Sequence, residues 1–302
     1  MNRILDIGDR PARLNVEDGL LCVRVEGGPE ARVPLAEVGA LLVSHGRVVF
    51  THGVLAGLSA SGGVYVACDE RHMPVGMMLP LAGNSVQTER IAAQAEASAP
   101  LRKQAWKYVV QMKLVNQAWA LSLVRGHGHG LEGMAARVRS GDPGNVEGEA
   151  ARKYWRFLFG ANGFTRDRAS GGVNAWLNYG YAVVRAVMGR AVCAAGLHPS
   201  LGLHHHNRYD AFCLVSDLME PYRPLVDVCA AGMAAAHGTE RELGKELKRE
   251  LLEFLNQDFL VEGERRELFS LCAQTARSLG ELYCGQRNRM FLPRFEGLGG
   301  VP

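Results

Sequence analysis

The spacing of hydrophobic residues changes near residue 85, and this change constrains the fold more than any other feature of the sequence. Before it, apolar residues come in short runs that glycine, proline and aspartate separate, which is the pattern of β-strands. After it, apolar residues recur every three or four positions over long segments, which is typical of helices. The sequence therefore predicts an α+β protein, in which a small N-terminal β-rich domain (residues 1–84) precedes a larger all-helical domain (residues 85–302).

The N-terminal region consists of strand-like segments with turn residues between them. One segment, "HGVLAGLSASG" at residues 52–62, is helical in pattern instead. The region contains no compact cluster of catalytic residue types, so we expect it to serve packing or dimerisation. Strands are predicted at residues 3–8, 12–16, 19–25, 31–35, 39–44, 47–51 and 63–69.

The C-terminal region begins with long helical patterns. The first starts at Val86 and is broken near Pro100, because proline removes a backbone donor and clashes inside a helix. Residues 145–160 predict another helix, with Asn145 as its N-cap. A very apolar helix is predicted at residues 174–197, and three polar residues interrupt it. These interruptions favour a buried core helix over a membrane span.

Two further helices are expected near the C-terminus. The segment "TERE", from Thr239 to Glu242, has the form of a capping box and predicts a helix that runs toward Phe254. A last helix is expected at about residues 264–285. The tail "FLPRFEGLGGVP" after it has no regular pattern, and we expect it to be irregular.

Composition places the chain among ordinary globular proteins of the cytoplasm. Hydrophobic residues make up 47% and charged residues 22% of its 302 residues. The first ten residues, "MNRILDIGDR", are too charged for a signal peptide. The cysteines are odd in number and form no CxxC pair, which indicates free thiols in a reducing cytoplasm: Cys22, Cys68, Cys193, Cys213, Cys229, Cys272 and Cys284.

Positive charge is concentrated in one part of the chain. The formal net charge is only +3, which alone does not indicate a nucleic-acid partner. Between Gln87 and Gly160, however, 11 Lys and Arg residues stand against 6 Asp and Glu residues. Such an excess suits a polyanion, but it is also common on a solvated helical face.

The segment "HPSLGLHHHNRYDAFCLVSDLMEP", residues 198–221, brings histidines close to a pair of carboxylates. Asp217 and Glu220 are three positions apart, so on a helix they share a face. Two carboxylates held together repel each other unless a cation or a proton lies between them. The segment is therefore either a polar turn before a helix or part of a metal site.

A third carboxylate is available in "VEGEAARKY", where Glu147 and Glu149 lie in the first turn of a predicted helix. Spacing does not distinguish these two glutamates, and either one also suits a simple contact with the helix dipole. A histidine with several carboxylates and no cysteine partner suits Mg²⁺ or Mn²⁺ better than structural zinc. Ions of this kind most often serve phosphate chemistry.

Three segments carry a resemblance to a known family. The segments "NVEGEAARKYW", "NAWLNYGYAVVRAVMGRAVCAAGLHPSLGLHHHNRYDAF" and "SDLMEPYRPLVD" resemble the CRISPR-associated integrase family, the metal-dependent DNA endonucleases of spacer acquisition. The resemblance extends over the whole chain, with the motifs in the same order. It is strongest to the branch found beside single-protein RNA-guided effectors.

The resemblance assigns roles to particular residues. It places the first metal carboxylate at Glu147, and it places the metal histidine, the last residue of an "LGxxH"-like string, at His205. The motif "DLMEP" then implies Glu220 as the third ligand, with Asp217 beside it as a less direct ligand or as a group that orients the site. Many relatives have a further acid where this chain has Ser216.

The resemblance also implies a reaction. Mg²⁺ or Mn²⁺ at this site would polarise a DNA phosphodiester, and the 3′-hydroxyl of a short prespacer duplex would attack it. The product is a prespacer joined to the CRISPR repeat. One phosphodiester replaces another, so no energy source is required, and the sequence indeed contains no GxxxxGK[ST] motif.

The resemblance implies partners as well. These are double-stranded DNA (prespacer and repeat), a second copy of the chain bound mainly through the β-rich domain, and a small companion protein. No membrane is implied. The basic helices before Glu147 then become candidates for contacts with DNA phosphates, through Arg90, Arg102, Lys103, Lys107 and Lys113.

Two other function classes fit the same residues. One is a metal-dependent DNA-repair nuclease, which would use the same ligands without a companion protein or repeat DNA. The other is a non-catalytic DNA-binding scaffold in which the polar cluster is structural. Metal-dependent strand transfer into a supplied repeat distinguishes all three.

Overall fold

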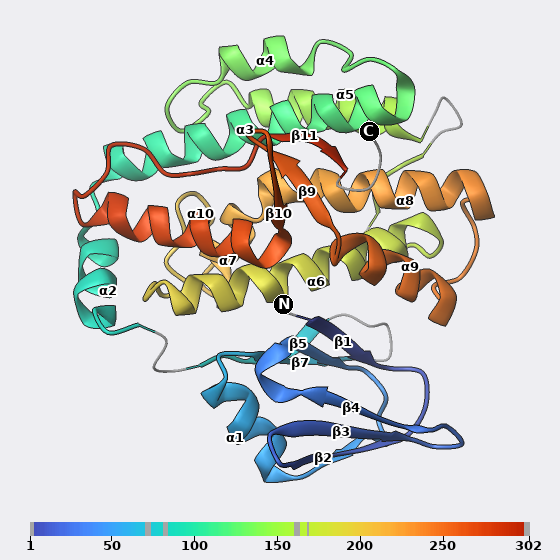
Figure 1. Ribbon diagram of the computed structural model, residues 1–302. Coiled ribbons are helices and arrows are strands. Elements are labelled where there is room, and N and C mark those ends of the chain that lie inside the picture. Colours follow the sequence, from blue (N-terminus) through green and yellow to red (C-terminus); the bar gives the residue numbers. More distant parts are fainter. Residues whose placement is uncertain (1–2, 70–73, 81–83, 160–163, 168, 299–302) are drawn as a thin grey trace.

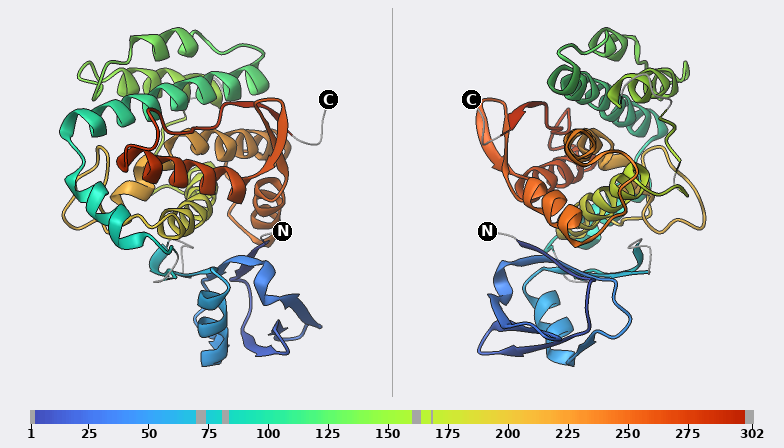
Figure 2. Two further views of the ribbon diagram at one scale, coloured as in Figure 1. Left: turned by 60° about the vertical axis from the view of Figure 1, so that its left-hand side comes forward. Right: turned by 90° about the vertical axis from the view of Figure 1, so that its right-hand side faces the viewer.

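The computed structural model describes residues 3–69, 74–80, 84–159, 164–167 and 169–298. Strands form most of the N-terminal region, and helices form most of the rest (Figures 1 and 2). The predicted α+β class, with a strand-rich beginning and a helical remainder, is confirmed. The description of the second part as all-helical is wrong in one respect, because that part also holds a small sheet of three strands.

Two four-stranded sheets and one helix build the N-terminal region. The first sheet has the order β1-β5-β7-β8, in which only the pair β7 and β8 is antiparallel. The second has the order β4-β3-β2-β6. The elements are β1 (Arg3–Ile7), β2 (Ala12–Glu17), β3 (Leu20–Val25), β4 (Glu30–Pro34), η1 (Leu35–Glu37), β5 (Val38–Val43), β6 (Val49–Phe50), α1 (His52–Ala60), β7 (Val64–Cys68) and β8 (Pro74–Met78).

Strand β5 is buried along its whole length and serves two hydrophobic cores. Leu41 and Val43 belong to a core that the N-terminal region forms by itself. Ala40 and Leu42 belong to the large core of the helical region. Successive side chains of a strand point to opposite faces, so this sheet has the small core on one face and the helices on the other.

Helices surround the large core. Figure 1 shows α3, α4 and α5 together at one side, with α6 and α9 next to the N-terminal region. The largest fully buried side chains include Trp106 on α3 and Trp176 on α6. The elements are α2 (Gln87–Glu96), α3 (Ala99–Arg125), α4 (Leu131–Arg137), α5 (Val146–Leu158), α6 (Val173–Ala194), α7 (Cys213–Leu218), η2 (Glu220–Tyr222), α8 (Arg223–His237), α9 (Lys245–Leu255) and α10 (Leu268–Tyr283).

Some local signals are confirmed. The predicted break near Pro100 falls between α2 and α3, where the Ser98 hydroxyl accepts a hydrogen bond from the Leu101 amide. Asn145 is the N-cap of α5, and its side chain accepts a hydrogen bond from the Gly148 amide at 3.2 Å.

The prediction for "TERE" is wrong. Helix α9 begins only at Lys245, and its N-cap Gly244 has no side chain with which to cap. The Thr239 hydroxyl instead donates to the Glu240 carboxylate at 3.2 Å. The capping-box spacing is therefore present in the sequence but is used by a loop.

The predictions for the last helix and for the tail also need correction. Residues 264–267 form a strand, and the helix α10 begins only at Leu268. The strands β9 (Asp258–Val261) and β10 (Glu264–Glu267) pair as a hairpin, and β11 (Phe295–Leu298) adds to β9 from the tail. Glu262 and Gly263 between β9 and β10 both have positive φ, which is the geometry of a tight hairpin turn.

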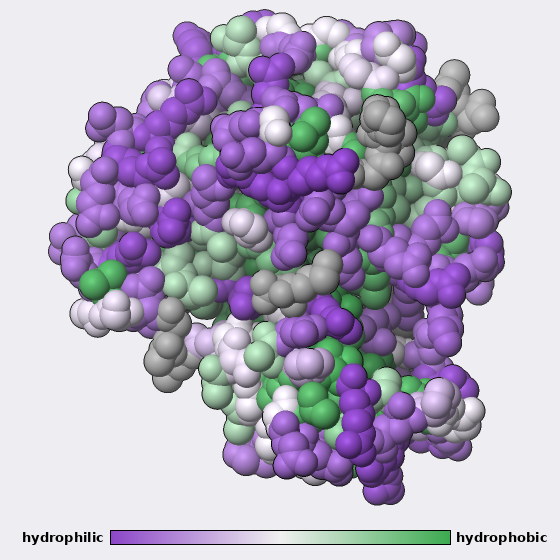
Figure 3. Space-filling view, viewed as in Figure 1, coloured by the Kyte–Doolittle hydropathy of each residue, from purple (hydrophilic) through white to green (hydrophobic). Residues whose placement is uncertain are grey.

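The surface of the face in Figure 1 is not uniform. Hydrophilic residues dominate over the helices, and hydrophobic residues gather over the strands of the N-terminal region (Figure 3). Two apolar side chains of this region are well exposed, Val49 at 58% and Val75 at 69%. No helix among the described residues is long and apolar enough to span a membrane. The seven cysteines are free thiols, as predicted.

Candidate functional site

Three elements meet around the Lys113 ammonium in the interior of the helical region. Lys113 lies on α3, Glu147 in the first turn of α5, and Glu220 at the start of the η2 turn. The Nζ atom of Lys113 lies 2.6 Å from Glu147 Oε1 and 2.6 Å from Glu220 Oε2. Two carboxylates that the sequence places 73 positions apart are thus held by one cation.

The backbone at Glu147 is held by the side chain of Asp142, which precedes α5. The Asp142 carboxylate accepts hydrogen bonds from the Val146 and Glu147 amides, both at 3.0 Å. These contacts hold the first turn of α5 and direct Glu147 toward α3. Glu149, the alternative that spacing left open, pairs instead with Arg137 at 3.1 Å, with about half of each side chain exposed.

Glu220 is almost fully buried. Its Oε1 lies 3.0 Å from Arg223 Nε. Burial alone would raise the pKa of Glu220, but Arg223 and then Lys113 outweigh it, so the pKa is lowered and the carboxylate is charged. Its Oε2 contacts the ammonium, yet it accepts no well-directed hydrogen bond from any residue that the structure describes.

A buried asparagine holds the turn that carries Glu220. The Asn116 amide on α3 donates to the carbonyls of Pro221 at 2.8 Å and Pro293 at 2.9 Å. Its carbonyl oxygen accepts a hydrogen bond from the Phe295 amide at 3.1 Å. One side chain therefore ties α3 to the η2 turn and to the C-terminal strand β11.

Asp217 organises the segment between α6 and α7, residues 195–212, which we call the histidine loop. It is completely buried on α7, and its Oδ2 accepts hydrogen bonds from the amides of Leu203 at 2.6 Å and His204 at 2.9 Å. Its Oδ1 lies against Nδ1 of His205. This hydrogen bond is the main reason why the pKa of His205 is raised, and it leaves Nε2 as the ring nitrogen directed away from Asp217.

The expectation that Asp217 and Glu220 share one helical face is wrong. Helix α7 ends at Leu218, and Glu220 belongs to a separate 3-10 turn. Asp217 therefore faces the loop, whereas Glu220 faces Lys113 and Arg223.

The start of the histidine loop is anchored to α2 and α3. The buried Gln94 amide donates to the carbonyls of His198 at 3.0 Å and Leu201 at 2.9 Å. The His204 ring stacks on Trp106 with ring centroids 4.5 Å apart, and His205 meets the same indole edge-on. Trp106 is itself buried, so it supports the loop from within the core.

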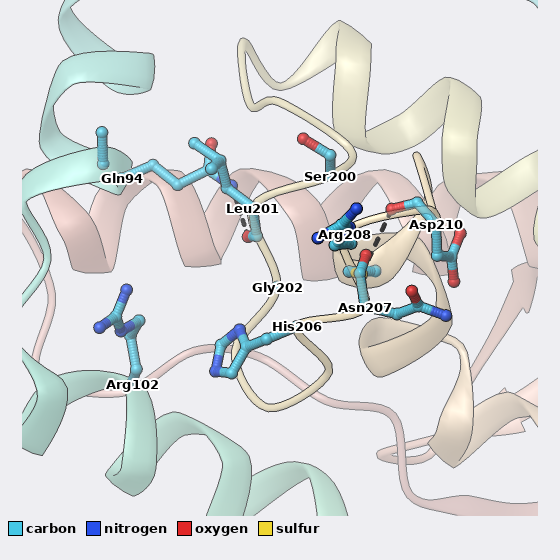
Figure 4. A pocket seen from close by; sticks show the side chains of 11 residues that line it. Gln94, Arg102, Ser200, Leu201, Gly202, His206, Asn207, Arg208 and Asp210 are labelled. Atoms are coloured by element: carbon cyan, nitrogen blue, oxygen red, sulfur yellow. Dashed lines mark hydrogen bonds between the residues drawn. The ribbon is translucent and has the colours of Figure 1, made fainter.

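A cavity of about 300 Å³ lies on the outer side of this loop. Figure 4 shows Arg102 of α3 facing the loop residue His206 across it, with Arg208 farther along the loop. These side chains give the cavity a basic rim. Arg102, one of the residues predicted to contact DNA phosphates, thus lines a cavity beside the site.

A second cavity of about 440 Å³ contains the candidate ligands His205 and Glu220. Its lining is strongly cationic, and it also includes Pro74 from the N-terminal region. The basic side chains are those of Lys113, Arg166, Arg185 and Arg223. A cavity that combines a ligand carboxylate and a ligand imidazole with several cations suits a phosphate group near a metal ion.

The donor set fits a divalent cation. Two carboxylates and an imidazole nitrogen are ligands that Mg²⁺ or Mn²⁺ accepts, and Glu220 offers a buried oxygen without a well-directed hydrogen bond. Among the described residues, however, no three His, Cys, Asp or Glu side chains already form a metal-binding group. Glu147 and Glu220 instead close on the ammonium of Lys113.

Two of the predicted phosphate contacts have partners within the protein, and the prediction for one of them, Lys113, needs correction. Lys113 does not face solvent, because its side chain is 12% exposed and is held by carboxylates. Its pKa is raised: burial alone would lower it, but Glu220 and Glu147 outweigh burial. Arg90 donates to the Ala195 carbonyl at 2.7 Å, so it holds the end of α6. Lys103 is exposed and Lys107 is half-buried on α3, and both stay predictions.

Sequence reasoning missed the arginines of the larger cavity. Arg166 donates to the Asn178 side chain at 2.6 Å, and its guanidinium lies over the Tyr181 ring. The Arg223 guanidinium also lies over the Tyr181 ring, 4.8 Å from its centroid. Arg223 follows the motif "DLMEP" by two positions, and its position three residues after Glu220 was the available signal.

Comparisons with known proteins identify a family that this chain resembles. The family model described as "CRISPR associated protein Cas1" matches residues 6–246. A CRISPR-associated endonuclease Cas1 from Neisseria meningitidis serogroup C is 33% identical over 262 residues, which is 86% of this chain and 84% of the relative.

Solved structures share the fold. A casposase bound to integration product has a TM-score of 0.82 at 18% identity, covering 97% of this chain and 94% of that one. A Cas6-RT-Cas1–Cas2 complex has a TM-score of 0.74 at 16% identity, covering 96% of this chain and 36% of that one.

Proposed function

Because the chain belongs to the family of CRISPR-associated protein Cas1, we propose that it is a metal-dependent DNA endonuclease and integrase. It inserts short prespacer DNA into a CRISPR repeat by transesterification. The observation that carries the proposal is that Glu147 and Glu220 both contact the Lys113 ammonium, beside a cavity that Glu220, His205 and several cationic side chains line. The named activity of the Neisseria relative and the integration product bound by the casposase support it.

Glu147, His205 and Glu220 would hold Mg²⁺ or Mn²⁺. The ion supplies Lewis-acid stabilisation of the charge that develops on a phosphodiester under attack. Asp217 holds the imidazole of His205 by Nδ1, so that Nε2 is the nitrogen offered to the ion. Arg223 and Arg166 add positive charge around the phosphate.

The reaction is balanced without a cofactor that supplies energy. A bond forms between the 3′ oxygen of the prespacer and a phosphorus atom of the repeat. The bond from that phosphorus to the 3′ oxygen of the repeat strand breaks, and this oxygen leaves as a hydroxyl. The same site with water as the nucleophile gives nuclease activity.

DNA reaches the site along the basic surface of α3. Arg102, Lys103 and Lys107 are the proposed backbone contacts, and Arg208 on the rim of the smaller cavity joins them. Such contacts neutralise phosphates irrespective of sequence, so binding weakens steeply with salt. Base reading is not required of any of these residues.

The proposed assembly follows the family. Residues 1–84 are the dimerisation domain and residues 85–302 the catalytic domain of a cytoplasmic homodimer. A Cas2-type companion protein joins two such dimers, in keeping with the Cas1–Cas2 composition of the solved relative. The exposed Val49 and Val75 are apolar surface that a dimer contact would cover.

The test is strand transfer with the full-length protein, its companion, Mn²⁺, a labelled prespacer and a plasmid that carries the repeat. Integrase activity predicts labelled plasmid that disappears in Glu220→Ala. Cleavage of DNA without transfer would favour a repair nuclease. DNA binding without either reaction would favour a scaffold, and both of these results contradict the proposal.

A further inference from the structure

The Lys113 ammonium occupies the space between the two carboxylates that are proposed to bind a divalent ion. It contacts Glu147 Oε1 and Glu220 Oε2 at the same distance of 2.6 Å. The side chain is 12% exposed and comes from α3, whereas the carboxylates come from α5 and η2. The contact is therefore a largely buried salt bridge between three elements and not a flexible ion pair at the surface.

The charges at this position are already balanced. Glu147 and Glu220 carry two negative charges, and Lys113 and Arg223 carry two positive ones. A divalent ion added to this arrangement would give a surplus of positive charge in a largely buried place. Like charges at such short distances repel strongly where water is excluded.

The geometry of the bridge is close to that of a metal site. A divalent ion of this class binds carboxylate oxygens at about 2.0–2.1 Å, so the glutamates would move only slightly to exchange the ammonium for an ion. The two cations cannot both hold the same pair of oxygens closely. Displaced from the bridge, the ammonium remains next to the cationic cavity that it also lines.

We propose that Lys113 is an internal counter-cation that holds Glu147 and Glu220 together without metal and that a divalent ion must displace. Lys113 thereby sets the affinity of the site for the ion. This inference rests on the proposed function, because it assumes that these glutamates are ligands. A lysine with a purely structural role would instead affect the stability of the protein equally with and without metal.

The experiment measures binding of Mn²⁺ alone to the full-length protein without DNA, by titration of free Mn²⁺ and by thermal melts. Lys113→Met should bind Mn²⁺ about tenfold more tightly or better, since removal of a unit charge beside the ion is a large Coulomb change relative to RT. Without metal its melting temperature should be lower than that of the wild type. Saturating Mn²⁺ should therefore produce a larger thermal shift in the variant.

Two variants complete the comparison. Lys153→Met removes an exposed lysine from α5, the helix that carries Glu147, and it should change neither the affinity nor the thermal shift. Lys113→Gln, which can still hydrogen-bond to one carboxylate, should also bind Mn²⁺ more tightly than the wild type. It serves as the test if Lys113→Met does not fold.

The outcomes separate the inference from the function. If Glu220→Ala loses Mn²⁺ binding while both Lys113 variants bind with unchanged or weaker affinity, the role of Lys113 is overturned and the metal centre stands. If Glu220→Ala binds Mn²⁺ as well as the wild type does, the proposed metal centre is itself wrong. Tighter binding in the Lys113 variants that Glu220→Ala abolishes supports both.

Discussion

Glu147 and Glu149 occupy the same turn of α5, yet their surroundings differ completely. The Glu147 carboxylate contacts the buried ammonium of Lys113, whereas Glu149 pairs with Arg137 at the surface. A surface ion pair of this kind contributes little to stability or function. The two residues are therefore a matched pair for testing the proposed site.

Glu147→Gln keeps the shape of the side chain and removes its charge. Strand transfer should fall roughly 100-fold or more, because a lost metal ligand removes several kcal/mol of charge stabilisation. Glu149→Gln should keep most of the activity. Initial rates of strand transfer at saturating Mn²⁺ provide the measurement, and equal losses in the two variants would mean that the start of α5 acts only as a structural unit.

Asp217→Asn should separate the stability of the histidine loop from its chemistry. The buried carboxylate accepts hydrogen bonds from the Leu203 and His204 amides, and an amide side chain cannot replace all of its acceptors. We expect a loss of about 2–3 kcal/mol in the free energy of unfolding, measured by urea titration. His205→Ala, which removes a half-exposed ring, should cost much less, and a larger loss for His205→Ala would contradict this assignment.

The individual site residues were predictable only in part. Glu147, His205, Asp217 and Glu220 lie in motifs that a family resemblance marks, and the structure brings them into one neighbourhood. The burial of Lys113 was not predictable, because its partners come from elements far along the chain. A lysine on an amphipathic helix gives the same pattern whether it meets solvent or distant carboxylates.

At the scale of elements, the predictions found the long helices and the short strands before residue 70, but they missed the later strands β8 to β11. Helices α3, α5 and α6 have many turns of consistent pattern. The β9–β10 hairpin has two strands of four residues each, which is too short for an alternation to stand out beside the following helix. Its turn at Glu262 and Gly263 was a usable signal.

Three helices are joined by a buried carboxyl group that no sequence motif predicted. Asp227 on α8 accepts hydrogen bonds from Tyr154 of α5 at 2.8 Å and from Tyr181 of α6. Burial raises the pKa of Asp227 to about 6, although both tyrosines and Arg223 act against it. The protonated form is thus favoured in the folded protein relative to the unfolded chain.

This pKa shift predicts a pH dependence of stability. A carboxyl group whose folded pKa is raised contributes stability that is complete below its unfolded pKa and is lost as the pH rises through about 6. Relative to Asp227→Asn, the wild type should therefore lose up to about 3 kcal/mol of unfolding free energy between about pH 4 and pH 7. Urea unfolding of both proteins across this range is the measurement, and a constant difference would show that Asp227 does not titrate there.

At the scale of the whole molecule, one sheet of the N-terminal region packs against the helices. Alternate residues of β5 enter different cores, so the N-terminal region is packed on the helices and not merely linked to them. The sequence predicted both parts from their periodicity. It did not predict this contact, because a strand buried on both faces shows no alternation that identifies its two partners.

A partly buried cluster of charges lies where these two parts meet. Lys248 on α9 is 3% exposed, and its Nζ lies 3.8 Å from Asp6 Oδ2 and 3.6 Å from Asp9 Oδ1. The Tyr179 hydroxyl of α6 donates to Asp6 at 3.1 Å. Burial raises the pKa of Asp6, while Lys248 and Tyr179 oppose the rise.

Lys248→Met should destabilise the molecule in a pH-dependent manner. Without the ammonium, the buried Asp6 carboxylate lacks its cation, and breaking a buried pair costs about 3–5 kcal/mol. The pKa of Asp6 should then rise further, so protonation should relieve the loss as the pH falls. Urea unfolding should show a larger deficit relative to the wild type at about pH 8 than at about pH 5, whereas Lys245→Met, at an exposed position on the same helix, should show little at either. An equal deficit at both pH values would mean that Lys248 acts through the packing of its aliphatic stem and not through its charge.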